Sequence, residues 1–243
     1  MEIIFLVAVL AILGPVIGSL IGIITKPSNR FMFNMLSFAA GVMLSISFIE
    51  LIPVSIKLSS PLISMTGIFL GAIVMFAIDR SIPHLHHGLC EPEQGLKLKK
   101  TSIYLLLGIA MHNFPEGMAM GIGSTIGVGS GLVIALAIAI HDIPEGICTS
   151  APYYLYSKKK LKSFLLSSAT AIPTLLGFLL AYFLLRNISP LFIGLITAAT
   201  AGLMIYISAD ELIPASCSKT TNHSTIFSLM VGVILTILLV SMK

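Results

Sequence analysis

The sequence predicts an all-α membrane protein with eight transmembrane helices. Its 243 residues have a mean hydropathy of +1.03, and 56% of them are hydrophobic while only 10% are charged. Soluble domains carry about 25% charged residues, so this composition indicates that lipid surrounds most of the surface. A helix of about 20 apolar residues crosses a bilayer, which leaves room for eight spans. A closed barrel would need polar and apolar residues to alternate, and the apolar runs do not alternate.

The predicted spans are bounded by charged residues, prolines and glycines. In chain order they cover residues 2–24, 32–56, 62–82, 101–124, 130–154, 163–185, 190–214 and 223–242. The first span has no basic residues before it and is too long for a signal peptide, so we interpret it as a membrane helix. We expect residues 1–243 to form a single transmembrane domain.

The basic residues divide unequally between the two ends of these spans. Eleven of the fourteen Lys and Arg residues fall on one side, and Lys57, Arg186 and Lys243 fall on the other. The side richer in Lys and Arg is normally cytoplasmic, so we expect both termini to lie outside the cell. The net charge of +4 therefore reflects topology and does not indicate a nucleic-acid partner.

Two segments far apart in the chain repeat each other. Residues 40–53 read AGVMLSISFIELIP and residues 201–214 read AGLMIYISADELIP, with nine identical positions out of fourteen. They lie in the second and seventh predicted spans, which cross the membrane in opposite directions. This relation predicts an inverted repeat that relates spans 1–3 to spans 6–8 around spans 4 and 5, as in secondary transporters. The alternative is a shared helix end without functional meaning.

The connection between the third and fourth spans, residues 83–100, is the one extended polar insertion. It reads PHLHHGLCEPEQGLKLKK, and we expect it on the cytosolic side. Its histidines and acidic residues suggest a weak metal-binding tract, with a flexible soluble loop as the alternative. Cys90, Cys148 and Cys217 lie far apart, so they indicate neither a disulfide framework nor a thiolate metal site.

Two similar motifs place polar residues in the middle of apolar spans. HNFPEG covers residues 112–117 and HDIPEG covers residues 141–146, in the fourth and fifth spans. The His and Glu of each motif are four positions apart and share one face of a helix. An Asn or Asp follows each His. The six polar residues are His112, Asn113, Glu116, His141, Asp142 and Glu145.

These polar residues need a compensating partner, because an Asp at the bilayer centre alone costs about 2.5–3.5 kcal/mol. Imidazole and carboxylate together suit Zn²⁺ and other first-row divalent ions. Two His and two Glu can supply four ligands, and the carboxylates can bridge a second ion between helices. The lack of thiolates suits reversible binding. The alternative is a structural cluster in which Glu–His pairs join the two helices.

Proline and glycine near the motifs predict local backbone features. Pro115 and Pro144 each remove a helical hydrogen bond, which is tolerated in a membrane where the backbone is buried in protein or lines a wet cavity. The pairs Gly117/Gly121 and Gly127/Gly131 have the small-xxx-small spacing of close helix contacts.

HNFPEG and HDIPEG resemble the signatures of the fourth and fifth spans in the ZIP (Zrt/Irt-like) family of divalent metal transporters, of the prokaryotic type. The resemblance extends over nearly the whole chain, including the His-containing loop and DELIP in the seventh span. It implies a binuclear site midway through a prokaryotic plasma membrane and import of Zn²⁺, or of Fe²⁺, Mn²⁺ or Cd²⁺, into the cytosol. By that resemblance, the first ion is held by His112, Glu116, His141 and Glu145. The second is held by Asn113, Asp142 and the shared Glu116 and Glu145.

One position departs from the family pattern. Many prokaryotic members have AEP in the sixth span, where the Glu completes the second site, but this chain reads ATAIPTLLG with Ile172 in that place. We therefore expect the second metal position to be the weaker one. The resemblance also suggests a cytosolic exit path for the metal, with solvated loop residues as the alternative. Its candidates are Asp79, His84, His86, Asp210 and Glu211.

Two other functions compete with transport. An intramembrane metalloprotease would need HExxH, which the sequence lacks. A non-transporting metal sensor stays open, because binding residues alone do not establish flux. We expect a transporter and not an enzyme, with divalent metal ions and the lipid bilayer as partners. A homodimer is compatible with the sequence.

Overall fold

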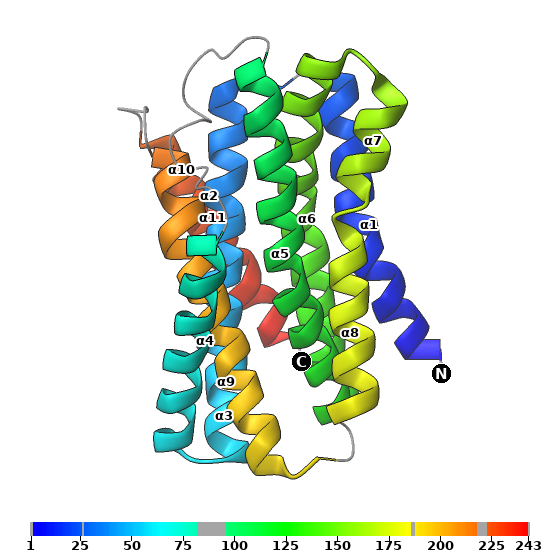
Figure 1. The fold of residues 1–243 in the computed structure, drawn as a ribbon. Coiled ribbons are helices and arrows are strands. Elements are labelled where there is room, and N and C mark those ends of the chain that lie inside the picture. The colour runs from blue at the N-terminus through cyan, green and yellow to red at the C-terminus, as the bar shows by residue number, and fades with distance from the viewer. Residues whose placement is uncertain (1, 26, 82–95, 186–187, 218–222, 243) are drawn as a thin grey trace.

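The computed structural model shows helices side by side in an elongated bundle (Figure 1). It describes residues 2–25, 27–81, 96–185, 188–217 and 223–242. Within these residues every regular element is helical, as the sequence predicts. The eleven α-helices are α1 (Glu2–Thr25), α2 (Asn29–Ile46), α3 (Ile52–Leu58), α4 (Pro61–Ser81), α5 (Leu96–Ile126), α6 (Val128–Ser157), α7 (Lys160–Ser168), α8 (Ala171–Leu185), α9 (Pro190–Ile207), α10 (Ile213–Cys217) and α11 (Ser224–Ser241).

Seven of the described helical segments are long and apolar enough to cross a membrane. They are Phe5–Thr25, Asn29–Leu58, Pro61–Arg80, Val128–Ser157, Lys160–Leu184, Pro190–Ser216 and Ser224–Ser241. The remaining long helix, α5, has 31 residues and lies within the same bundle (Figure 1). The predicted all-α membrane fold is therefore confirmed, with several predicted spans built from more than one helix.

Two π-helical turns interrupt the repeated segments at matching positions. They are η1 (Ser47–Leu51), between α2 and α3, and η2 (Ser208–Leu212), between α9 and α10. The serine that opens each turn hydrogen-bonds back to a carbonyl one turn earlier, over 2.9 Å in η1 and 2.8 Å in η2. A proline follows each turn and removes a further helical hydrogen bond. The similar sequences thus produce the same local backbone.

The long helices pack against one another in pairs. Helix α1 packs along α6 and α8 packs along α5, while α5 and α6 also pack against each other. Helix α2 packs along α11, and α9 packs along α4. Figure 1 shows α1, α5, α6 and α8 on one side of the bundle, with α4 and α9 on the other. The two central helices that carry the polar motifs are therefore enclosed by neighbours.

Small residues let some of these backbones approach closely. A Cβ atom added to Gly117 would lie 2.7 Å from the carbonyl carbon of Thr174 on α8, which confirms the close contact predicted there. The same prediction for Gly127 is wrong, because a Cβ atom there would meet no atom within 4 Å. Gly127 lies between α5 and α6, directly before the first residue of α6.

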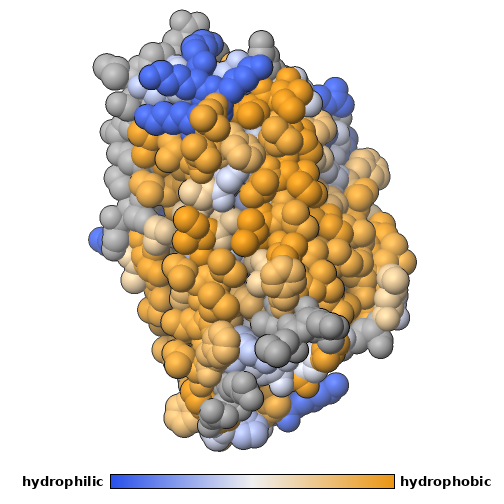
Figure 2. Space-filling view, turned by 90° about the vertical axis from the view of Figure 1, so that its right-hand side faces the viewer, coloured by the Kyte–Doolittle hydropathy of each residue, from blue (hydrophilic) through white to orange (hydrophobic). Residues whose placement is uncertain are grey.

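The outer surface of the bundle is largely apolar. Figure 2 shows a broad hydrophobic face with a large group of hydrophilic residues at its upper end and a smaller group at its lower end. The exposed basic residues at the α6–α7 connection are Lys158, Lys159, Lys160 and Lys162. Both chain ends lie in the lower half of Figure 1, away from this connection. An apolar belt with a charged end is the surface that a membrane-embedded bundle requires.

Candidate metal centre

The polar residues of the two motifs are buried where α5 faces α6. Asn113 and Glu116 belong to α5, and His141, Asp142 and Glu145 belong to α6; each is at most 1% exposed. Both helices continue through their prolines, Pro115 and Pro144. The motifs thus bring their side chains into the interior of a bundle whose outside is apolar.

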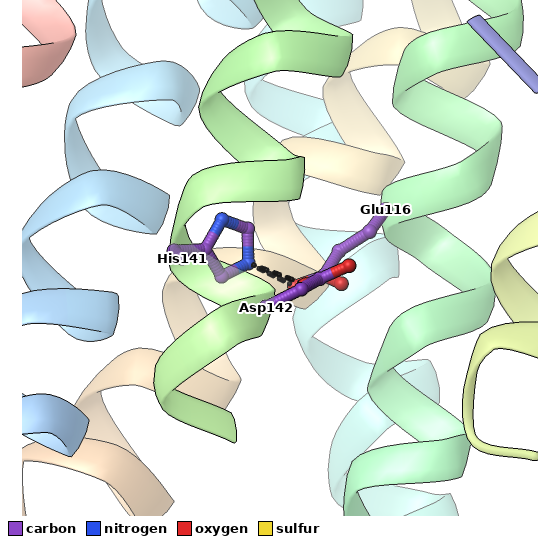
Figure 3. Close-up of side chains that lie close together, drawn as sticks. All are labelled: Glu116, His141 and Asp142. Carbon is purple, nitrogen blue, oxygen red and sulfur yellow. Dashed lines mark hydrogen bonds and ion pairs between the residues drawn. The ribbon is translucent and has the colours of Figure 1, made fainter. Parts of the chain in front are cut away.

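Three of these residues form a compact group. Glu116, His141 and Asp142 each offer a ligand atom, and these atoms all lie within 4.8 Å of one another. The Nε2 atom of His141 is 2.9 Å from Oε1 of Glu116 and 3.4 Å from Oδ1 of Asp142. Figure 3 shows the imidazole and the two carboxyl groups converging between the helices. All three are 0% exposed, so solvent screens them little.

The backbone of α6 sets the orientation of the His141 ring. Its Nδ1 atom is 3.2 Å from the carbonyl oxygen of Ala137, one turn earlier on the same helix. A carbonyl only accepts, so Nδ1 carries the proton that is donated there, and Nε2 faces Glu116. Metal-bound histidines commonly donate their second ring N–H in this way. Nε2 is therefore the ring nitrogen that can bind a cation.

Asn113 is oriented by the helix break in the sixth span. Its Nδ2 atom donates a 2.8 Å hydrogen bond to the carbonyl oxygen of Thr170, between α7 and α8. The amide oxygen consequently points elsewhere, and no hydrogen-bond partner for Oδ1 lies among the described residues. The same is true of Oε2 of Glu116. Buried oxygen atoms without donors suit a cation, because leaving them bare in an apolar interior is costly.

The compact group does not account for all the residues of the motifs. Glu145 is 1% exposed on α6, one turn beyond His141, but is not part of the compact group. The backbone of His112 belongs to α5, whereas its side chain lies outside the described residues. Cys148 is buried nearby on α6, and its Sγ atom donates to the carbonyl oxygen of Met32 over 3.6 Å. The described group therefore combines imidazole with carboxylates, the ligand chemistry of zinc and related divalent ions.

Comparison with known proteins identifies the family. The family profile described as "ZIP Zinc transporter" matches residues 81–240. The chain belongs to the ZIP family. Two relatives named "Zinc transporter ZupT", from Shigella flexneri serotype 5b (strain 8401) and Escherichia coli O127:H6, are 34% and 35% identical over 240 residues. Each alignment covers 96% of this chain and 93% of the relative. A third, from Enterobacter sp. (strain 638), is 34% identical over 89% of this chain and 87% of its own length.

Membership of the ZIP family resolves one alternative that the sequence left open. ZIP proteins are transporters and not enzymes, so the intramembrane metalloprotease is excluded. The matched residues 81–240 include both motifs and the seventh span. This ZIP protein is therefore an integral membrane protein whose relatives along almost its whole length are zinc transporters.

The candidate exit residues of this ZIP protein lie in two places. Asp79 is near the end of α4 with an exposed fraction of 9%, and its Oδ2 atom accepts a 3.5 Å hydrogen bond from the hydroxyl of Tyr206 on α9. Asp210 lines a groove with Tyr206, and Glu211 follows it within η2. His84 and His86 lie outside the described residues. Among the described residues, the acidic ones here do not form a second compact metal-ligand group.

Ile172 does not lie in the compact group either. Its side chain is 57% exposed at the start of α8, on the outside of the bundle. Thr170, two residues earlier, is only 4% exposed and contacts Asn113 instead. The side chain next to Asn113 at this helix break is thus that of Thr170 and not that of Ile172.

The sequence analysis missed a network of hydroxyl groups next to the metal-site helices. The Oγ atom of Ser167 on α7 accepts a 2.6 Å hydrogen bond from Ser19 on α1 and lies 2.5 Å from the hydroxyl of Thr149 on α6. It also lies 3.2 Å from the carbonyl oxygen of Gly146, to which it donates. Serines within apolar spans were the sign of this network in the sequence. Their hydrogen-bond partners lie on other helices, and the sequence does not show which helices meet.

Proposed function

We propose that this ZIP protein imports Zn²⁺ into the cytosol through the site formed by its two motifs. The observation that carries the proposal is the compact buried group of Glu116, His141 and Asp142 between α5 and α6. A cation in an apolar interior needs ligands that replace its water and offset its charge, and two carboxylates with an imidazole do both. The relatives named as zinc transporters favour zinc among the divalent ions.

We extend this proposal to the full set of six motif residues. Glu145 is buried one turn from His141, and His112 opens the motif on α5 as His141 opens the motif on α6. Each of Glu145 and His112 can therefore add a ligand when a metal is present. Asn113 belongs to a second, weaker metal position with Asp142 and the glutamates. The hydrogen bond to Thr170 supports this role, because it holds the amide so that Oδ1 remains available. We infer that the first position is essential and the second dispensable.

The direction of transport follows from the proposed orientation. The lysines at the α6–α7 connection support a cytosolic location for that end of the bundle, with both termini outside. The matched turns η1 and η2, and the matched pairs α2–α11 and α9–α4, support the predicted inverted repeat. Transporters with such repeats expose a central site to each side of the membrane in turn. Asp79, Asp210 and Glu211 then offer carboxylates to the ion as it leaves.

Metal uptake by purified protein in liposomes tests this proposal. We expect uptake of Zn²⁺ in a panel that also includes Fe²⁺, Mn²⁺ and Cd²⁺, and loss of uptake in Glu116→Gln. Glu50→Gln is the matched control, because Glu50 is 4% exposed in η1 and outside the compact group. Equal uptake by wild type and Glu116→Gln contradicts the site. Zinc binding without any uptake by the wild type favours a sensor instead.

A further inference from the structure

A groove on the outside of the bundle is separate from the compact metal group. It has a volume of about 420 Å³, within the range of ligand-sized clefts, and opens between α5, α6 and α7. Most of its lining is apolar. The apolar residues that line it from α5, from α7 and from the residue after α7 are Ile103, Leu106, Leu107, Ala110, Leu166 and Ala169.

The groove extends along the helices from Lys162 to Thr170. These two lining residues are eight positions apart, which corresponds to about 12 Å at the rise of an α-helix. Ile103 and Ala110 line a similar length of α5, which begins at the same end of the bundle as the α6–α7 connection (Figure 1). The groove therefore follows about two turns of each helix, with an exposed lysine at one end and mostly apolar walls.

Its charge distribution matches one class of molecule. Lys162 is exposed at the rim, and Lys158, Lys159 and Lys160 are exposed next to it at the α6–α7 connection. Figure 2 shows hydrophilic residues gathered directly above the apolar face. Tyr153, only 5% exposed, lines the groove from α6 and brings a phenol to an otherwise apolar wall. A cationic rim above an apolar channel suits an anion that carries an acyl chain.

We infer that this groove binds one anionic phospholipid, with its phosphate at Lys162 and an acyl chain between α5 and α7. Basic pockets between transmembrane helices on the cytoplasmic side recognise anionic lipid head groups, whereas an uncharged lipid gains only the apolar contacts. The lipid comes from the leaflet at the lysine-rich end, which is the inner leaflet in the proposed orientation. The binding itself does not depend on the proposed zinc transport.

The end of the groove at Thr170 also touches the backbone that holds a candidate metal ligand. Thr170 lines the groove, and its carbonyl oxygen accepts the hydrogen bond from Asn113. Its hydroxyl donates a 2.7 Å hydrogen bond to the carbonyl oxygen of Ser167, which stabilises the break between α7 and α8. An acyl chain in the groove therefore packs directly against the break that orients Asn113.

Native mass spectrometry of the full-length protein tests the inference with phosphatidylglycerol and phosphatidylcholine of identical acyl chains. We expect tighter binding of phosphatidylglycerol, and a roughly fivefold loss of that preference in Lys162→Ala, the effect of one lysine near an anionic lipid surface. Lys57→Ala, at an exposed lysine of α3, is the matched control and retains the preference. Ala169→Leu fills the groove without changing charge and weakens binding of both lipids.

Three results would overturn the inference. Equal binding of the two lipids by the wild type would mean ordinary surrounding lipid only. An unchanged preference in Lys162→Ala, or unchanged binding in Ala169→Leu, would place the lipid elsewhere. Stabilisation by glycerol 3-phosphate as large as that by phosphatidylglycerol would indicate a site for free anions. Thermal unfolding without added lipid confirms that each variant is folded before binding is compared.

Discussion

The contact between α1 and α6 predicts a large effect from a single added carbon atom. Gly18 on α1 faces α6 so closely that a Cβ atom would overlap the carbonyl oxygen of Ile143. The same atom would lie 2.9 Å from the carbonyl carbon of Ile143 and 3.0 Å from Cα of Gly146. These are backbone atoms, so no side-chain rotation can make room. In Gly18→Ala the two helices must therefore separate.

The magnitude follows from ordinary contact distances. Carbon atoms pack at about 3.5–4.0 Å, so α1 and α6 must move apart by about 0.5–1 Å. Overpacking of this kind costs about 1–3 kcal/mol, and contact with backbone places Gly18→Ala near the upper end. The better helix propensity of Ala offsets about 1 kcal/mol. A net loss of about 2 kcal/mol lowers the unfolding temperature by about 4–8 °C in a chain of this size.

Thermal unfolding of the detergent-purified protein, with and without Zn²⁺, measures this effect. The stabilisation by Zn²⁺ should also fall, because α6 carries His141 and Asp142. Gly127→Ala is the matched control, since a Cβ atom there meets nothing within 4 Å, and its unfolding temperature should change by no more than about 2 °C. An unchanged unfolding temperature in Gly18→Ala, or an equal fall in Gly127→Ala, would refute the reasoning.

Four further substitutions test other parts of the structure. Asn113→Asp removes the donor to Thr170, so the free energy of unfolding of the metal-free protein should fall by about 1–3 kcal/mol, while its thermal stabilisation by Zn²⁺ increases. A smaller stabilisation by Zn²⁺ than in the wild type contradicts the second metal position. Ser167→Ala removes three hydrogen bonds of about 0.6 kcal/mol each, so the free energy of unfolding measured with a denaturant should fall by about 2 kcal/mol. An unchanged free energy of unfolding would mean that the network does not stabilise the fold. In a cysteine-free background, Lys159→Cys should react with an impermeant thiol reagent only from the cytosol, and Lys57→Cys only from outside; labelling of both from one side rules out the proposed topology.

Much of the fold could be predicted from the sequence because the bilayer imposes a simple rule on composition. Runs of apolar residues of the required length identified the spans, and the duplicated motifs identified the helices of the site. The division of spans into separate helices was not predicted. The break at Ala169 and Thr170 lies one turn before Pro173, which has no N–H to donate to the carbonyl oxygen of Ala169, and hydrogen bonds to Ser167 and from Asn113 stabilise it.

The site was predicted in kind more than in detail. Residue type and spacing were enough to select Glu116, His141 and Asp142, because few other reasons exist for such residues in lipid. The compact group combines Glu116 and His141, which are expected at the first ion, with Asp142, which is expected at the second, and it does not include Glu145. Which side chains meet depends on the rotation and separation of α5 and α6, and the periodicity of one helix carries no information on either.

The break in the sixth span has a consequence for how this span crosses the membrane. Helix α7 has 9 residues and α8 has 15, so at 1.5 Å per residue they reach about 13 Å and about 22 Å. Neither crosses a hydrocarbon layer of about 30 Å alone. The sixth span therefore crosses the layer only as α7 and α8 together, about 36 Å of helix, and the break lies inside the span. A backbone carbonyl without a helical partner is costly in lipid, so the side chain of Asn113, which donates to Thr170, helps to stabilise the broken span within the bilayer.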